Sequence, residues 1–133
     1  MAFYSGLGLD LPFTASGDMN SYQYYFVKCA STSNRIDVAT GGSDPAPIGV
    51  IQNDPYSTDL ATVRVLGISK VFVSSSVAIQ VGNLLTAGSA GAAEIVNSDG
   101  SAFHAVALED ISAGSGYIAA LLRFQNSELA GTK

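Results

Sequence analysis

The sequence predicts an all-β protein, a compact β-barrel or sandwich with an internal duplication and an extended N-terminal arm. The main observation is a repeated strand-turn-strand pattern. Residues 48–54 and 61–65 form the first copy, and residues 104–110 and 117–121 repeat it 56 positions later. In each copy an apolar strand ends in an acidic residue and is followed by a turn and a second strand. The composition agrees, because 47% of residues are apolar and only 13% are charged, so the chain can bury a core.

The first half begins with an arm, residues 1–20, in which apolar residues are spaced by glycine, aspartate and proline. The alternation has the period of a strand, but glycine and proline weaken a strand that stands alone. The arm therefore either packs on the body of the protein or lies on a partner, for example as an added strand. After it we expect an aromatic strand at 21–27, a polar turn, a strand at 35–39 and a loop.

A long strand is expected over residues 63–73, interrupted at Gly67, where the apolar phase shifts. Such a glycine indicates a bulge or bend of the kind that curls a sheet into a barrel. Residues 77–85 also fit one face of a helix, but Gly82 and the short length favour a strand end and a turn, or at most one helical turn.

The duplication extends beyond the first repeat, because residues 84–96 resemble residues 26–38 in outline: strand, turn, strand. The expected organisation is an arm, a body with two similar halves and a polar tail, at residues 1–20, 21–125 (halves about 22–73 and 80–124) and 126–133.

The charge pattern excludes two classes of partner. The net charge is −5 and no cluster of lysine or arginine occurs, whereas nucleic-acid binding needs a concentrated positive surface. No basic amphipathic stretch and no apolar run of about 20 residues is present, so no membrane contact is expected. The N-terminus lacks the features of a signal peptide, which predicts synthesis and assembly in a cytoplasm. With so few charges, much of the outer surface is expected to contact other chains.

The single cysteine and the single histidine are the first candidates for chemistry. Cys29 cannot form an intrachain disulfide, and its place in an apolar run predicts a small, half-buried strand residue. A small hydrolase would need His104 for a catalytic triad, but the duplication aligns His104 with Ile48, at a packing or strand-edge position. The sequence shows no spacing typical of a metal site, and we expect no catalytic residue, metal or cofactor.

The carboxylates and the tyrosines also have structural interpretations. Asp54 and Asp110 occupy equivalent strand ends, where short carboxylates cap turns by accepting backbone N–H bonds. Tyr22, Tyr24 and Tyr25 could stack on a sugar, but in a strand they alternate faces, which favours packing in the core or at an interface. The alternative function is a carbohydrate- or receptor-binding β module, which would need a tyrosine-lined exposed groove.

Four motifs in order resemble a known family: Ala-Pro-Ile-Gly-Val-…-Asp (46–54), Ala-Thr-Val-Arg-Val-…-Gly (61–67), Val-Gly-Asn-Leu-Leu-Thr-Ala (81–87) and Ala-Val-Ala-Leu-Glu-Asp-Ile-Ser-Ala-Gly (105–114). They resemble the small decoration, or cement, proteins of tailed-bacteriophage capsids, formerly catalogued as a domain of unknown function. The resemblance covers roughly residues 25–124. In the phage context that it implies, the alternative function is a carbohydrate- or receptor-binding β module of a phage fibre or tail.

This resemblance implies a homotrimer of β-barrel-like bodies on the outer surface of a mature phage head, at three-fold positions of the major capsid protein. It also implies an N-terminal arm that reaches over neighbouring subunits, although here the first 20 residues are longer and more aromatic than in a minimal version. The residues expected to contact the capsid or another subunit are Phe3, Tyr4, Leu7, Leu9, Leu11 and Phe13.

Overall fold

The computed structural model describes residues 8–41, 46–96 and 102–125, and in these residues the protein is all-β. The strands, in chain order, are β1 (Gly8–Ala15), β2 (Phe26–Cys29), β3 (Arg35–Val38), β4 (Pro47–Ile51), β5 (Leu60–Ser75), β6 (Leu84–Ala87), β7 (Ala93–Ile95), β8 (Phe103–Ala107) and β9 (Gly114–Gln125). The predicted fold class is confirmed.

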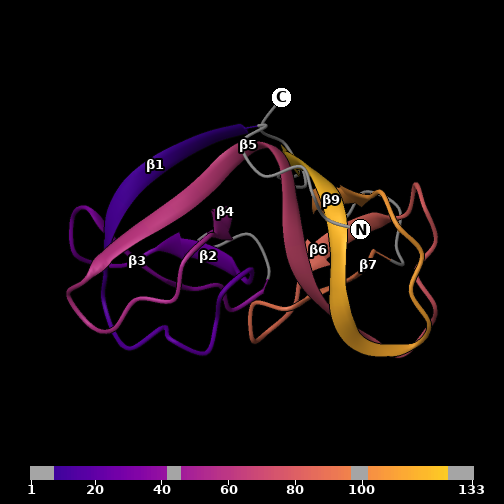
Figure 1. The fold of residues 1–133 in the computed structure, drawn as a ribbon, viewed down its shortest axis with the longest axis horizontal. Coiled ribbons are helices and arrows are strands. Elements are labelled where there is room, and N and C mark those ends of the chain that lie inside the picture. Colours follow the sequence, from indigo (N-terminus) through magenta and orange to yellow (C-terminus); the bar gives the residue numbers. More distant parts are fainter. Residues whose placement is uncertain (1–7, 42–45, 97–101, 126–133) are drawn as a thin grey trace, which may run out of the picture.

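The strands form two rings that share β5. One ring runs β1-β3-β2-β4-β5 and returns to β1, and the other runs β5-β7-β6-β8-β9 and returns to β5. We call them the first barrel and the second barrel. In Figure 1 the first barrel lies on the left and the second on the right, and β5 passes from one to the other.

The two barrels have the same pairing directions at every position. In the first, β1 runs parallel to β3, and all other neighbours are antiparallel. In the second, β5 runs parallel to β7, and again all other neighbours are antiparallel. The repeated unit is therefore a ring of five strands, in which β5 serves as the last strand of one copy and the first strand of the next.

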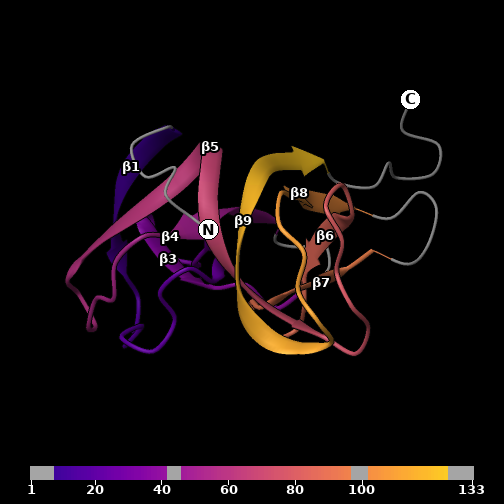
Figure 2. The ribbon, with the colours of Figure 1, turned by 45° about the vertical axis from the view of Figure 1, so that its right-hand side comes forward.

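Strand β5 bends where the sequence predicts it. Up to Gly67 it pairs with β1 and β4, and from Gly67 onward it pairs with β9. Gly67 has φ 101°, a conformation that glycine adopts far more readily than other residues. Figures 1 and 2 show β5 turning sharply at this point, so the predicted bend separates the two barrels.

Each barrel has its own apolar core, but the two cores are not built alike. In the first barrel, Val27 and Ile51 point inward and pack with Val63. Their neighbours Phe26 and Val50 point the opposite way, because side chains alternate along a strand, and they join the core of the second barrel. The outward side of the first barrel thus packs against the second barrel and forms part of its core.

Several expected elements are confirmed, and two expectations are wrong. The strands near 35–39, 48–54 and 84–96 are present as β3, β4 and the β6–β7 pair. The strand expected at 21–27 begins only at Phe26, because Tyr24 has φ 70° and residues 22–25 form a turn. Cys29 lies at the end of β2 as an exposed residue, not a half-buried one, because the strand leaves the core there.

The described part of the N-terminal arm packs on the protein's own body. Strand β1 pairs with β5 from Gly8 to Thr14 and with β3 at Thr14 and Ala15. Of the two alternatives for the arm, these residues take the first. Residues 1–7 and 126–133 lie outside the described part of the chain.

Candidate interaction surfaces

The predicted contact residues divide into three groups. Phe3, Tyr4 and Leu7 lie outside the described residues. Leu9 and Leu11 are exposed, at 48% and 37% of their surface. Phe13 is half-buried and packs against the core of the first barrel.

Leu66 joins the two exposed leucines of β1. It lies directly opposite Leu9 in the antiparallel pair of β1 and β5, and it is 58% exposed. We call Leu9, Leu11 and Leu66 the apex patch, since they lie beside the bend of β5. The second edge of β1, from Leu9 to Phe13, pairs with no strand in the part of the chain that the structure describes. An apolar patch beside an unpaired strand edge is typical of a surface that binds another chain.

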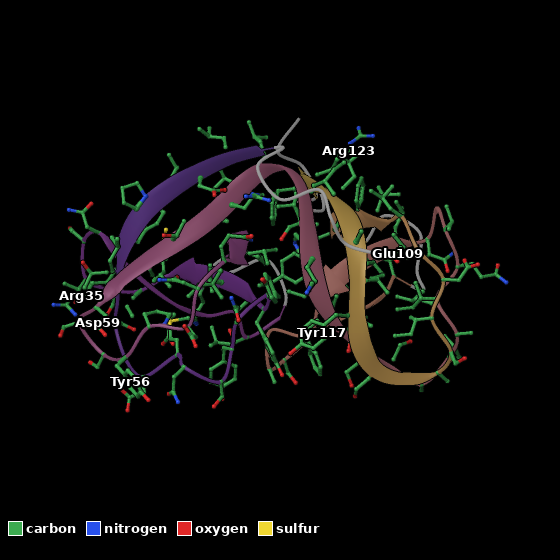
Figure 3. All side chains as sticks on the ribbon, viewed as in Figure 1. Arg35, Tyr56, Asp59, Glu109, Tyr117 and Arg123 are labelled. Carbon is green, nitrogen blue, oxygen red and sulfur yellow. The ribbon has the colours of Figure 1, made fainter. Side chains whose placement is uncertain are left out.

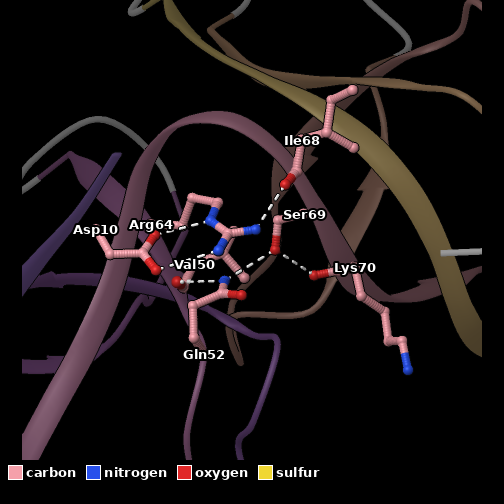
Figure 4. Close-up of polar contacts among 7 residues, drawn as sticks. All are labelled: Asp10, Val50, Gln52, Arg64, Ile68, Ser69 and Lys70. Carbon is pink, nitrogen blue, oxygen red and sulfur yellow. Dashed lines mark hydrogen bonds and ion pairs between the residues drawn. The ribbon is translucent and has the colours of Figure 1, made fainter. Parts of the chain in front are cut away.

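A buried arginine holds the bend beneath this patch (Figure 4). Arg64 is only 6% exposed, and its Nε and Nη2 donate to the two carboxylate oxygens of Asp10 at 2.7 and 3.1 Å. Its Nη1 donates to the carbonyl oxygen of Ile68 at 2.9 Å. A bidentate ion pair between arginine and a carboxylate is strong and directional. Arg64 therefore ties β1 to both sides of the bend in β5.

A second polar contact supports the bend from the side of β4 (Figure 4). The Gln52 amide nitrogen donates to the Val50 carbonyl at 3.0 Å and to Ser69 Oγ at 2.9 Å. Ser69 Oγ in turn donates to the carbonyl of Lys70 at 2.7 Å. These hydrogen bonds give the polar groups at the point where the two barrels meet the partners that buried polar groups need.

The tyrosines form an aromatic cluster at the junction of the barrels. Tyr25 stacks on Phe72 with 4.7 Å between ring centroids, and Tyr24 meets Tyr117 edge to face at 6.0 Å. Lys70 Nζ lies 5.0 Å from the centroid of the Tyr24 ring. Tyr117 is 53% exposed and lies between the two halves in Figure 3. Packing at an internal junction is thus the principal use of these rings.

This environment changes the acidity of Tyr25. Burial raises the pKa of its phenol above the ordinary 10.0, and Tyr117 and Tyr22 raise it further because their phenolate charges repel a third negative charge. The neutral phenol is therefore the form that fits the cluster.

His104 lies in the core of the second barrel and is fully buried. Its ring contacts both Phe26 and Phe124, at 5.8 Å from the centroid of each, and these two rings also contact each other. Its Nδ1 accepts the backbone N–H of Ala87 at 3.1 Å. The prediction of a packing position is confirmed.

The turn caps are present, but mostly on other residues than predicted. Asn53 Oδ1 accepts the N–H of Thr62 at 3.0 Å, and Glu109 Oε1 accepts the N–H of Ala119 at 2.6 Å. Asp110 Oδ1 accepts the N–H of Val81 in a different loop at 2.8 Å. Asp54, by contrast, is exposed. The side chains that bond the second strand of each copy thus lie one position earlier than predicted, at Asn53 and Glu109, whereas Asp110 accepts a backbone N–H as predicted.

The described residues contain no cluster of metal ligands and no membrane-spanning helix. Within 8–41, 46–96 and 102–125, no group of three or more histidine, cysteine, aspartate or glutamate residues could hold a metal ion. Over the same ranges no helix is long and apolar enough to cross a membrane.

Comparison with known proteins shows a likeness of fold. No protein-family model matches this chain, and no curated protein matches it. Among solved structures, the chain is similar to the N base of the head fiber protein gp8.5 of bacteriophage phi29, with a TM-score of 0.65 and 21% sequence identity. The match covers 91% of this chain and 98% of that chain. The two therefore share a fold over nearly their whole lengths.

Proposed function

We propose that this protein is a non-enzymatic structural component of a bacteriophage head. In the specific form of the proposal it is a homotrimeric decoration, or cement, protein that binds the major capsid protein on the outer surface of the head at three-fold positions and stabilises the shell. The observation that carries the proposal is the likeness of fold to the phi29 head fiber base over 91% of the chain. The ordered motifs that resemble capsid decoration proteins give it independent support.

The surface of the molecule suits such a role. The apex patch exposes three leucines beside a strand edge that no other described strand pairs with, on a chain with few charges. A capsid subunit that covers the patch would bury apolar area and could add a strand to β1. A trimer would repeat this contact three times, so that individually weak contacts act together through a high effective concentration.

The buried position of His104, the residue that a catalytic triad would require, supports the non-enzymatic part of the proposal. His104 is fully buried and packs against two aromatic rings, and its Nδ1 accepts a hydrogen bond from a backbone N–H. A general base must reach the proton that it abstracts, and a fully buried ring does not reach a substrate.

The test is binding to heads of a phage that encodes this chain, prepared without it. Added protein should give new density at three-fold positions in electron cryo-microscopy images. Leu9→Glu combined with Leu66→Glu should reduce occupancy at least tenfold, because two charges would be buried in an apolar contact. Point substitutions are preferable to deletion of the arm, since β1 closes the first barrel.

Tyr56→Glu is the matched control. Tyr56 is 59% exposed and lies far from the apex in Figure 3, so its substitution should leave occupancy unchanged. Unchanged occupancy of the double leucine variant would rule out the apex patch as the capsid contact. Added density at no position on the head would overturn the proposed function.

A carbohydrate- or receptor-binding module is the second candidate, and the exposed ring of Tyr117 is the observation that favours it. The other rings of the cluster offer little to a sugar, because Tyr25 is stacked on Phe72 and Lys70 lies over Tyr24. A glycan array would decide the matter: binding that is lost on Tyr117→Ala would support the second candidate.

A further inference from the structure

The first barrel presents an apolar pair to the second barrel. Phe26 on β2 and Val50 on β4 are register partners and are both fully buried. The Phe26 ring lies 5.8 Å from the ring centroid of His104 and 6.1 Å from that of Phe124, both in the second barrel. This pair is thus the central contact between the two barrels.

The second barrel carries an equivalent pair, Leu84 on β6 and Val106 on β8, in the same register. The turns that precede the two pairs confirm the equivalence. The N–H of Tyr24 donates to the Ile51 carbonyl at 2.8 Å, and the N–H of Gly82 donates to the Ala107 carbonyl at 2.8 Å.

Both turn residues have positive φ, 70° at Tyr24 and 92° at Gly82. Leu84, however, is 39% exposed, and Val81 in its turn is 60% exposed. The face that is buried in the first barrel is therefore open in the second.

The surface that receives the first turn also has a counterpart. Tyr24 and Tyr25 rest on the pair of Phe72 and Tyr117, which are register partners in β5 and β9 of the second barrel. Phe72 precedes Val73, the residue through which β5 meets β7.

The corresponding pair in the first barrel is Thr14 and Leu60. Ala15 pairs with β3 in parallel, as Val73 pairs with β7, and Thr14, the residue before Ala15, is the register partner of Leu60. Leu60 is 62% exposed. The molecule thus has an uncovered copy of each side of its own internal contact.

We propose that these two surfaces bind each other between copies of this chain. Residues 80–84 of one molecule, with Val81 and Leu84, dock on Thr14 and Leu60 of a second molecule, as residues 22–26 dock on Phe72 and Tyr117 within one molecule. Two different surfaces are joined, so the contact is head-to-tail and closes into a ring when the rotation permits. The inference rests on the self-association in the proposed function and names the faces that carry it. A ring of three chains would contain six similar barrels.

One backbone difference makes the contact between molecules weaker than the contact within one. The N–H of Phe72 donates to the Tyr24 carbonyl at 2.9 Å, so the first turn is bonded into the rim of the second barrel. The N–H of Thr14 already donates to Asn34 of its own chain at 2.9 Å. The contact between molecules therefore relies on apolar side chains, and single charges should break it.

The first experiment measures mass in solution by light scattering and sedimentation. The wild-type protein should give three times the 13.6 kDa chain mass. Leu84→Glu and Leu60→Glu should each give the single-chain mass with an unchanged far-ultraviolet circular dichroism spectrum. Leu66→Glu is the matched control, because Leu66 is an exposed leucine outside the proposed contact, with 58% of its surface exposed against 62% for Leu60, and it should keep the wild-type mass.

The second experiment tests the head-to-tail geometry in a Cys29→Ser background, which removes the exposed native thiol. Leu60→Cys and Leu84→Cys are treated with a short bismaleimide cross-linker. Each variant alone should remain uncross-linked, a mixture of the two should give a dimer, and the double variant should give a ladder that ends at the closed ring. A dimer from either variant alone would show a two-fold contact and overturn the proposal.

The outcomes separate this inference from the proposed function. If the wild-type protein is a trimer and neither glutamate variant lowers its mass, the trimer uses other faces, and this inference fails while the head-binding role stands. If the wild-type protein has the single-chain mass at every concentration, both this inference and the proposed trimer fail. If Leu84→Glu lowers the mass but no phage head gains density, the contact stands and the proposed function fails.

Discussion

The two barrels have one strand order but unequal cores. Among the residues that the structure describes, the core of the first barrel is made only of its own residues. The core of the second also takes in Phe26, Ala39 and Val50 from the first. Residues of the first barrel therefore form part of the core of the second barrel, whereas no described residue of the second barrel joins the core of the first. The difference teaches that one copy of a repeated unit can depend on the other for part of its core while both keep the same strand order.

The largest expected effect is on Phe26, the residue that the first barrel contributes most deeply. Phe26→Ala should lower the free energy of unfolding by about 3–5 kcal/mol, because it leaves a cavity where a fully buried ring packed. Its counterpart is Leu84, and Leu84→Ala should cost less than about 1 kcal/mol within a single molecule, since Leu84 is partly exposed. Urea denaturation measures both. Equal losses would contradict the asymmetry between the barrels.

The next effect concerns Asp10 and Arg64. Asp10→Ala should cost about 2–3 kcal/mol, because it leaves the buried Arg64 guanidinium without its counter-charge. The register partners at the equivalent place in the second barrel are apolar, Ile68 and Leu121.

The double variant Asp10→Ile and Arg64→Leu copies that pair into the first barrel, and it should cost less than Asp10→Ala alone. Asp59→Ala, at an exposed carboxylate, is the control and should change stability by at most about 0.5 kcal/mol. A double variant less stable than Asp10→Ala would show that the charged pair itself is needed at the bend.

A smaller effect is expected at the turn that precedes β6. Gly82→Ala should cost about 1 kcal/mol, because the residue has φ 92° while an added Cβ would meet no atom within 4 Å. The loss of stability thus comes from the backbone conformation and not from a steric clash. Gly17→Ala also meets no atom within 4 Å and has no positive φ, so it should be neutral or slightly stabilising in thermal unfolding. Equal melting temperatures for the two variants would contradict this account.

The smallest effect is a dependence on pH at the junction. Since burial raises the pKa of Tyr25 above 10.0 in the folded state, its contribution to stability is complete below pH 10 and is lost as pH rises from 10 through the folded-state value. Tyr25→Phe should therefore show a shallower loss of stability above pH 10 than the wild-type protein. Parallel curves for the two proteins would show that Tyr25 does not carry this dependence.

The sequence was informative where the two copies kept similar residues. The repeat of residues 48–65 and the phase shift at Gly67 predicted the repeated strands and the bend, because both depend on local alternation and on glycine. It did not reveal that β1 and the second part of β5 are also copies of each other. Their equivalence lies in pairing direction and register, which long-range contacts decide.

The candidate surfaces were harder to predict for a related reason. Tyr24 adopts positive φ without the glycine that marks the same turn at Gly82, so residues 21–27 looked like a continuous strand. Leu60 and Leu66 share the alternation of Thr62 and Arg64, and Leu84 that of Thr86, so they lie out of phase with the core residues of their strands. Only the assembled barrels show which exposed surfaces they form. Leu9 and Leu11, by contrast, could be selected because glycine, aspartate and proline surround them.

The shared strand β5 has a consequence for how the molecule responds to force. The halves are not joined by a linker, so there is no hinge about which one could swing and no natural place to cut between them. A load applied to one half passes along sixteen residues of hydrogen-bonded backbone directly into the other. In the proposed role on a phage head, such a part would behave as a rigid clamp and not as a tether.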